Sequence, residues 1–163
     1  MKKLTTIVAL ALFISVSAFA GTGKTSGPEN ETKVTERVKS AFKKSFSEAV
    51  NVNWNSKEDF YFADFKLKEK YMTAAYNQDG ELLGMSRKIE FAQLPLATQQ
   101  ALEDRFPGYS ISKVGTEVMY EGQTNYYLAA ENSKKMLKLK CSADGVITIE
   151  KTIRKKKLVG SAY

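Results

Sequence analysis

The residue types that enzymes use most often for acid–base and nucleophilic chemistry are nearly absent from this sequence. It contains no histidine and a single cysteine, Cys141. Without histidine, Ser/His/Asp and Cys/His catalysis and every histidine-containing zinc site are excluded, and one cysteine cannot complete a four-cysteine metal site. The candidates for carboxylate chemistry, Asp59, Asp64 and Glu69, stand among lysines and are typical of charges at strand ends. We therefore predict a protein that is not an enzyme and that has no catalytic residue, metal site or cofactor.

Two stretches resemble ligand-binding loops but lack the surroundings that such loops need. The segment AFAGTGKT, residues 18–25, has alanine in place of the first glycine of a phosphate-binding P-loop, and SGP follows it instead of a helix. The NQDG turn at residues 77–80 lacks the ligand series and the closing glutamate of a calcium-binding EF-hand. Neither stretch predicts a nucleotide or calcium site.

The first twenty residues have the composition of a secretory signal peptide. The chain starts with MKK, continues with an apolar run over residues 4–19, and carries a small-residue cleavage site, AFA, at residues 18–20. This run is shorter than the ~20 residues that span a bilayer. We therefore expect residues 1–20 to be a cleaved signal peptide and the mature protein to be periplasmic or secreted. Residues 21–31, rich in Gly, Thr and Ser, are expected to form a flexible linker.

The remaining chain is expected to be one domain, residues 32–157, made of two repeats at about 32–91 and 92–157, with a tail at 158–163. Apolar side chains recur every three to four residues through positions 32–49, which predicts an amphipathic helix whose lysines meet water, and LPL at 94–96 opens a second helix.

The stretch FYFADFKLKEKYMTAAYNQDG, residues 60–80, indicates two strands and a tight Asp-Gly turn. The stretch NYYLAAENSKKMLKLKCSADG repeats this plan 65 residues later, and a further strand is predicted over residues 109–118. The sequence therefore predicts an α+β fold of tandem helix-plus-strand repeats, with two helices packed on one face of an antiparallel sheet.

Side chains along these strands alternate between an apolar face and a second face that is aromatic and basic. Cys141 falls on the apolar face, where a buried small hydrophobe is its simplest role. The second face, called the open face below, carries the residues that we predict to bind a partner, because aromatic residues and methionine are enriched in interfaces. The alternative is that the helices, the linker or a second copy covers this face, which would make its aromatic residues core. The predicted partner-binding residues are Phe60, Phe62, Lys66, Tyr71, Tyr127, Met136, Lys138 and Lys140.

The positive charge of the chain limits the kinds of molecule that it is expected to bind. The formal net charge is +7, and the cluster RKKK at residues 154–157 supplies much of the excess. Nucleic acid is not an expected partner outside the cytoplasm, so we expect an envelope protein, while the oligomeric state is left open. The basic cluster is either a solvated tail or a weak contact with anionic lipid or glycan.

Four short motifs recur in a recognisable order. Aromatic residues stand near two strand starts, FYF at 60–62 and NYY at 125–127; Leu94-Pro95 precedes the second helix, and FPGY at 106–109 ends it. Together these resemble the PepSY-like proteins exported by Bacteroidetes, which look like the β-lactamase-inhibitor-protein fold in tandem. The resemblance covers residues 32–153. It implies an exported, non-enzymatic domain with relatives that bind or inhibit other proteins, including peptidases and β-lactamases, and it implies no set of functional residues. A small-molecule or glycan carrier, with a pocket between helices and sheet, and an envelope-surface protein held by the basic tail remain as alternative functions.

Overall fold

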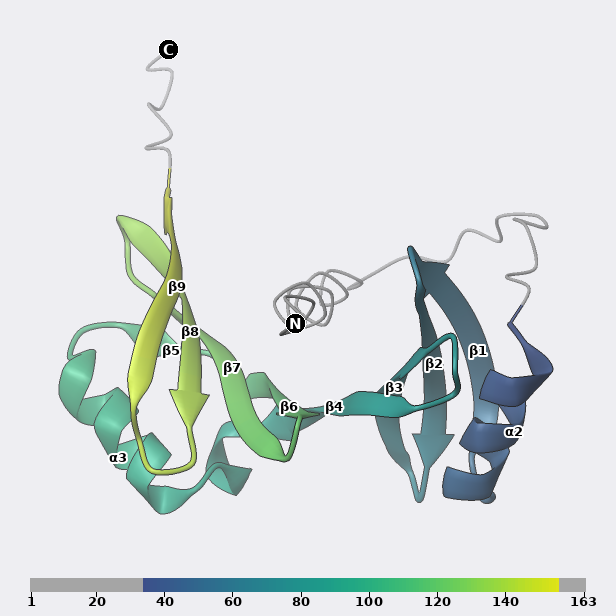
Figure 1. Cartoon of the computed structure of the whole chain (residues 1–163). Coiled ribbons are helices and arrows are strands. Elements are labelled where there is room, and N and C mark those ends of the chain that lie inside the picture. Colours follow the sequence, from purple (N-terminus) through teal and green to yellow (C-terminus); the bar gives the residue numbers. More distant parts are fainter. Residues whose placement is uncertain (1–33, 156–163) are drawn as a thin grey trace, which may run out of the picture. The chain divides into compact units, whose positions relative to one another are not determined.

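The computed structural model describes residues 34–155 (Figure 1). The expected signal peptide, the linker, the P-loop-like segment, the tail at 158–163 and the end of the basic cluster lie outside the described residues. The chain divides into two compact units, residues 1–86 and 87–163, called unit 1 and unit 2 below, and each is described by itself. Within residues 34–155, no helix is both long enough and apolar enough to cross a membrane.

The described residues form two α-helices, one 3₁₀ helix and nine strands, and the paired strands run antiparallel in the order β1-β2-β3-β4-β6-β7-β8-β9, with β5 beside β7. The predicted α+β class, two helices with an antiparallel sheet, is confirmed. Strand β4 contains the boundary between the two units. The elements are α2 (Glu36–Ser45), β1 (Val50–Lys57), β2 (Phe60–Leu67), β3 (Lys70–Asn77), β4 (Leu82–Glu90), η1 (Phe91–Gln93), α3 (Leu96–Arg105), β5 (Ser110–Ile111), β6 (Val114–Tyr120), β7 (Gln123–Glu131), β8 (Lys135–Ser142) and β9 (Ile147–Arg154).

In unit 1, helix α2 covers one face of the sheet. The Thr35 hydroxyl accepts a hydrogen bond from the backbone N–H of Val38 at 3.3 Å, which caps the start of the helix. The helix is shorter than the predicted 32–49, because Phe46 leaves helical backbone angles while its N–H still bonds to the Phe42 carbonyl. Val38 and Phe42 are the buried residues of the helix. Their partners on β2 and β3 are Ala63, Phe65, Ala74 and Tyr76, so the apolar set of the alternation is the set that faces the helix.

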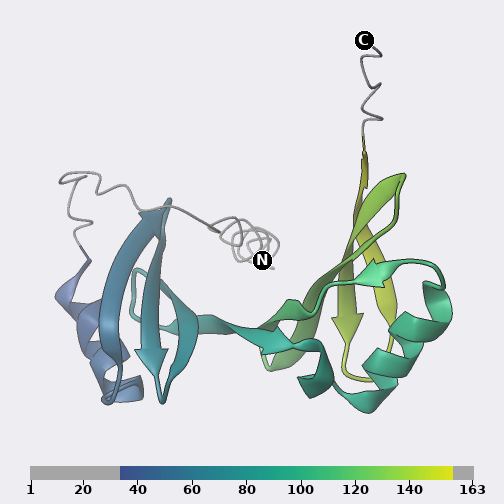
Figure 2. The same cartoon turned by 180° about the vertical axis from the view of Figure 1, so that it is seen from behind.

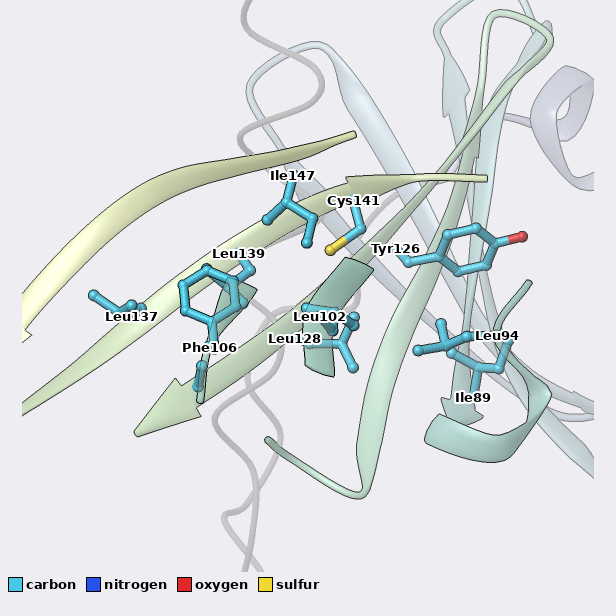
Figure 3. Close-up of a cluster of buried hydrophobic side chains, with 11 residues drawn as sticks. Ile89, Leu94, Leu102, Phe106, Tyr126, Leu128, Leu137, Leu139, Cys141 and Ile147 are labelled. Carbon is cyan, nitrogen blue, oxygen red and sulfur yellow. The ribbon is translucent and has the colours of Figure 1, made fainter. Parts of the chain in front are cut away.

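In unit 2, helix α3 packs on the corresponding apolar face (Figure 2). Leu102 and Phe106 from the helix segment meet Leu128 on β7 and Leu139 on β8 in one buried cluster. Figure 3 shows the sulfur of Cys141 among these apolar side chains. Cys141 is free and buried, which confirms its predicted role as a small core residue.

The segment predicted as one strand over residues 109–118 is instead two strands. Ile111 of β5 is paired with Ala130 of β7, and Thr116 of β6 is paired with Tyr127 of β7. Residues 112–115 therefore lie opposite residues 128–129 alone, so the β5–β6 segment contains two more residues than the facing part of β7. The break falls at Ser112, whose hydroxyl accepts a hydrogen bond from the Ala129 N–H at 3.1 Å. The serine side chain replaces part of the backbone hydrogen bonding between the strands. The period-two pattern of the sequence does not predict such a break.

The glycine of each Asp-Gly turn touches the first turn of the helix in its own unit. Gly80 (φ +77°) and Gly145 (φ +88°) have the left-handed backbone that the Asp-Gly signature predicts. A Cβ on Gly80 would lie 3.1 Å from the Arg37 carbonyl oxygen, and one on Gly145 would lie 2.8 Å from that of Ala97. The backbone of each turn therefore packs directly on a helix, which fixes where the helix lies over the strands.

Candidate functional site on the open sheet face

The eight residues predicted to bind a partner divide between the two units. Phe60, Phe62 and Lys66 lie on β2 and Tyr71 lies on β3 in unit 1, while the other four lie on β7 and β8 in unit 2. In each unit they occupy the sheet face opposite the helix, because their neighbours in the alternation are the residues packed on α2 or α3. The two groups are described separately.

In unit 1, Lys66 and Tyr71 are directly opposed across β2 and β3. The Lys66 Nζ lies 6.0 Å from the centre of the Tyr71 ring and 2.5 Å from a carboxylate oxygen of Glu69. The hydrogen bond to Glu69 raises the pKa of Lys66, so the lysine stays charged but is already paired. Tyr71 is 70% exposed and gives unit 1 its most accessible aromatic ring on this face.

The other two aromatic residues of unit 1 are less accessible than the alternation alone suggests. Phe60 is half-buried, and Phe62 is only 8% exposed, opposite the buried Ala75 on β3. Beside them Asp64 accepts a hydrogen bond from the Thr73 hydroxyl at 2.6 Å. The open face of unit 1 therefore combines one exposed ring with a hydrogen-bonded polar patch.

In unit 2, the predicted residues come together as a row. Met136, Lys138 and Lys140 follow one another at every second position of β8, and Tyr127 on β7 is directly opposite Lys140. All four side chains therefore lie on one face of the sheet.

Two further residues of this row were missed by sequence reasoning. On β9, Lys151 is opposite Lys138 and Ile153 is opposite Met136. The pairing is irregular between Lys138 and Leu139, so Glu150 is an extra residue in β9 and the alternation shifts by one position there. If side chains alternated strictly from Ile147 onward, Lys151 would lie on the apolar face with Ile147. No signal in the sequence predicts that the extra residue moves Lys151 to the open face.

The hydroxyl of Tyr127 is buried and has no hydrogen-bond partner among the described residues. Burial raises the pKa of Tyr127 to about 12, and the nearby charge of Glu150 adds to the effect. The tyrosine is therefore neutral at physiological pH, and the positive charge of this face comes from the three lysines. At the end of β9, Lys155 is paired with Glu131 at 3.0 Å, so this part of the basic cluster is locally neutralised.

Each carboxylate considered for catalysis is bonded to a different neighbouring side chain. Asp59 accepts a hydrogen bond from Gln78 at 2.7 Å, Asp64 is bonded to Thr73, and Glu69 is paired with Lys66. In the part of the chain that the structure describes, no group of three or more His, Cys, Asp or Glu residues is placed to hold a metal ion. The expectation of a non-enzymatic protein stays a prediction.

Comparison with known proteins gives structural relatives. No protein-family model and no curated protein matches the sequence. Among solved structures, the chain is similar to a BLIP-like (β-lactamase-inhibitor-protein-like) protein from Bacteroides fragilis, with 18% identity and a TM-score of 0.65 over 82% of this chain and 94% of that one. The fold is BLIP-like. A DUF2874 family protein from Bacteroides uniformis matches at 18% identity and a TM-score of 0.64, over 74% of this chain and 88% of that one.

A predicted periplasmic protein from Bacteroides eggerthii matches at 17% identity with a TM-score of 0.64, again over 74% of this chain and 88% of that one. Likeness at these identities concerns the BLIP-like fold alone. The BLIP-like architecture expected from the sequence is thus confirmed, whereas the PepSY-like name stays a prediction.

Proposed function

We propose that this chain is an exported, non-enzymatic module that binds another protein through the open face of its sheet. The observation that carries the proposal is the row in unit 2, where Lys138 and Lys140 on β8 and Lys151 on β9 share one sheet face with Met136 and Ile153. A protein interface has an apolar centre and a polar, solvent-accessible rim, and this row places both kinds of side chain next to each other. The helix of this unit packs on the other face of the sheet.

The charge of the row indicates the chemistry of the partner. Three lysines on one face favour an acidic surface, and such complementarity acts chiefly on the association rate and its dependence on salt. The predicted signal peptide supports a partner in the cell envelope, as does the predicted periplasmic location of one structural relative. An inhibitor-like role is supported only by the BLIP-like fold.

A pull-down from envelope extract tests the proposal. The variant Lys138→Glu/Lys140→Glu reverses two charges of the row, and Lys44→Glu/Lys113→Glu makes the same change in net charge at exposed lysines on α2 and between β5 and β6. We expect one acidic protein to be retained by the wild type and by the second variant, to be lost by the first, and to elute as salt is raised.

Far-UV circular dichroism first establishes that both variants are folded. If the first variant retains the same protein as well as the wild type does, the row is not the binding site. If the folded wild type retains nothing, the proposal of a protein partner fails.

A further inference from the structure

Unit 1 contains a groove on the helix side of its sheet, between α2 and β1. Its volume is about 420 Å³, which lies within the ~300–1,000 Å³ of typical ligand sites. The apolar lining consists of Phe42, Phe46, Ala49, Val52 and Trp54. This surface is separate from the open face, since α2 packs on the opposite side of the strands.

The groove lies at the edge of the sheet, where α2 leaves part of β1 uncovered. The buried helix residues Val38 and Phe42 pack on β2 and β3, and β1 is the last strand of the sheet, paired only with β2 among the described strands. Val52 is therefore 38% exposed, and Trp54 is half-buried. Apolar side chains at the edge of the sheet stay uncovered beside the helix.

The floor of the groove is built of aromatic rings in contact. The Phe42 ring centre lies 5.3 Å from that of Phe46 and 5.3 Å from that of Trp54, both within the range of favourable ring packing. Phe42 also packs on Phe65 of β2, at 5.0 Å. Rings held by the core form a preorganised apolar surface, which lowers the entropy that a ligand must lose to bind.

The rim of the groove is basic. Lys39 and Lys43 both line it, against the one acidic residue Glu36. Lys39 is paired with Glu36 at 3.0 Å, whereas Lys43 has no ion pair within residues 34–155. The ionic group available to a ligand is therefore an ammonium beside an apolar floor.

The corresponding region of unit 2 has a different charge. A groove of about 580 Å³ there is lined by the apolar Phe91, Ile111 and Val114 together with Glu90, Glu103 and Lys113. Two acids against one base reverse the balance found in unit 1. The basic rim is therefore a property of the α2–β1 groove and does not follow from the positive charge of the whole chain.

We infer that the α2–β1 groove binds a single-chain anionic amphiphile, such as a fatty carboxylate. The hydrocarbon chain lies on the floor of Phe42, Phe46 and Trp54, and the head group meets Lys43. Binding buries apolar surface on both sides, and the head group stays at the solvated rim, where no charge has to be desolvated. This site is independent of the protein-binding face proposed above.

The single tryptophan of the chain, Trp54, reports on this groove directly. Dodecanoate, kept below its micelle concentration, is titrated into the protein while tryptophan emission is recorded. We expect a saturable change in emission, and dodecyltrimethylammonium, with the same chain and a cationic head, should bind about tenfold more weakly because the rim charge then repels it.

Two pairs of variants locate the site. Lys39→Glu/Lys43→Glu should reverse the preference in favour of the cationic head group, because Glu36 and two further carboxylates would then line the rim. Val52→Asp should weaken dodecanoate binding, and Val50→Asp serves as its control, because Val50 lies on the same strand, is 55% exposed and does not line the groove. Circular dichroism establishes that each variant is folded.

Three outcomes would overturn the inference. The first is the absence of a saturable emission change, and the second is equal affinity for the two head groups. The third is a response to vesicles of phosphatidylglycerol without a response to monomeric dodecanoate, because the groove would then contact a membrane surface and would not hold a single molecule.

Discussion

Replacing Gly145 with alanine should destabilise unit 2 more than replacing Gly122, although both glycines have positive φ. The angles are +88° and +73°. A Cβ on Gly145 would lie 2.8 Å from the Ala97 carbonyl oxygen and 3.3 Å from the Cβ of Ala101, whereas nothing lies within 4 Å of a Cβ on Gly122. The second substitution therefore measures the backbone conformation alone, and the first adds contact with helix α3.

The two free energies can be worked out separately. An L-residue in the left-handed region costs ~1–2 kcal/mol, and the reduced freedom of the unfolded chain offsets ~0.4–1 kcal/mol of this. Gly122→Ala is thus expected to lower the free energy of unfolding by about 1 kcal/mol. Crowding in a packed interior adds ~1–3 kcal/mol, so Gly145→Ala should lower it by about 2–4 kcal/mol.

The turn at Gly145 has little room to move away from the helix. The buried Thr98 on α3 donates a hydrogen bond to the Ser142 carbonyl at 2.8 Å, and Arg105 donates to the Ile147 carbonyl at 2.6 Å. These bonds hold the two ends of the turn, so the strain of an added Cβ is expected to appear as lost stability and not as a displaced loop.

Urea unfolding followed by far-UV circular dichroism compares the two variants with the wild type. Both positions lie in unit 2, so the same transition reports on both. Losses that agree within ~0.5 kcal/mol would refute the reasoning, because that value is the size of error expected for a contact energy read from a structure. The turn would then relax around the added methyl group at no measurable cost.

Two further predictions concern buried ionisable groups. The pKa of Tyr127 is about 12 in the folded protein, above the ~10 of an unfolded tyrosine, so the unfolded state loses this proton first and stability should fall as pH rises from ~10 to ~12. Tyr127→Phe is expected to reduce that fall, measured as urea midpoints at pH 9 and pH 11, and an equal fall in both proteins would contradict it. Burial also raises the pKa of the Cys141 thiol to about 11, so iodoacetamide at pH 8 should label the folded protein far more slowly than the protein in urea. Equal rates would mean that the thiol reaches solvent in the native state.

The apolar face of the sheet followed from the sequence because strand geometry leaves few choices. Successive side chains must point to opposite faces, so one apolar residue in a strand assigns its neighbours at every second position. Phe65 and Ala74 share one face of unit 1, and Leu139 lies on the apolar face of unit 2, as this rule requires. The structure adds that these are the faces covered by the helices. The Asp-Gly turns were equally determined, since glycine is the residue that accepts positive φ without strain.

The accessibility of the open face did not follow from the same rule. Phe62 and Tyr71 both belong to the open-face set, yet one is buried and the other is largely exposed. The extra residue Glu150 in β9 changes which side chains face which side of the sheet, and the break at Ser112 between β5 and β6 interrupts the pairing with β7. Such shifts depend on pairs of residues far apart in the sequence, so the pattern within one strand does not contain them.

Periodicity within residues 32–49 determined that α2 has a polar, lysine-rich side and an apolar side. It could not determine that Lys43 and Trp54 line the same groove. That neighbourhood depends on where the helix lies across the strands, and the contact of Gly80 with the Arg37 carbonyl helps to fix this position. Local sequence sets which side of an element is apolar, whereas the tertiary packing of one element on another decides which apolar surface stays uncovered and which charges border it.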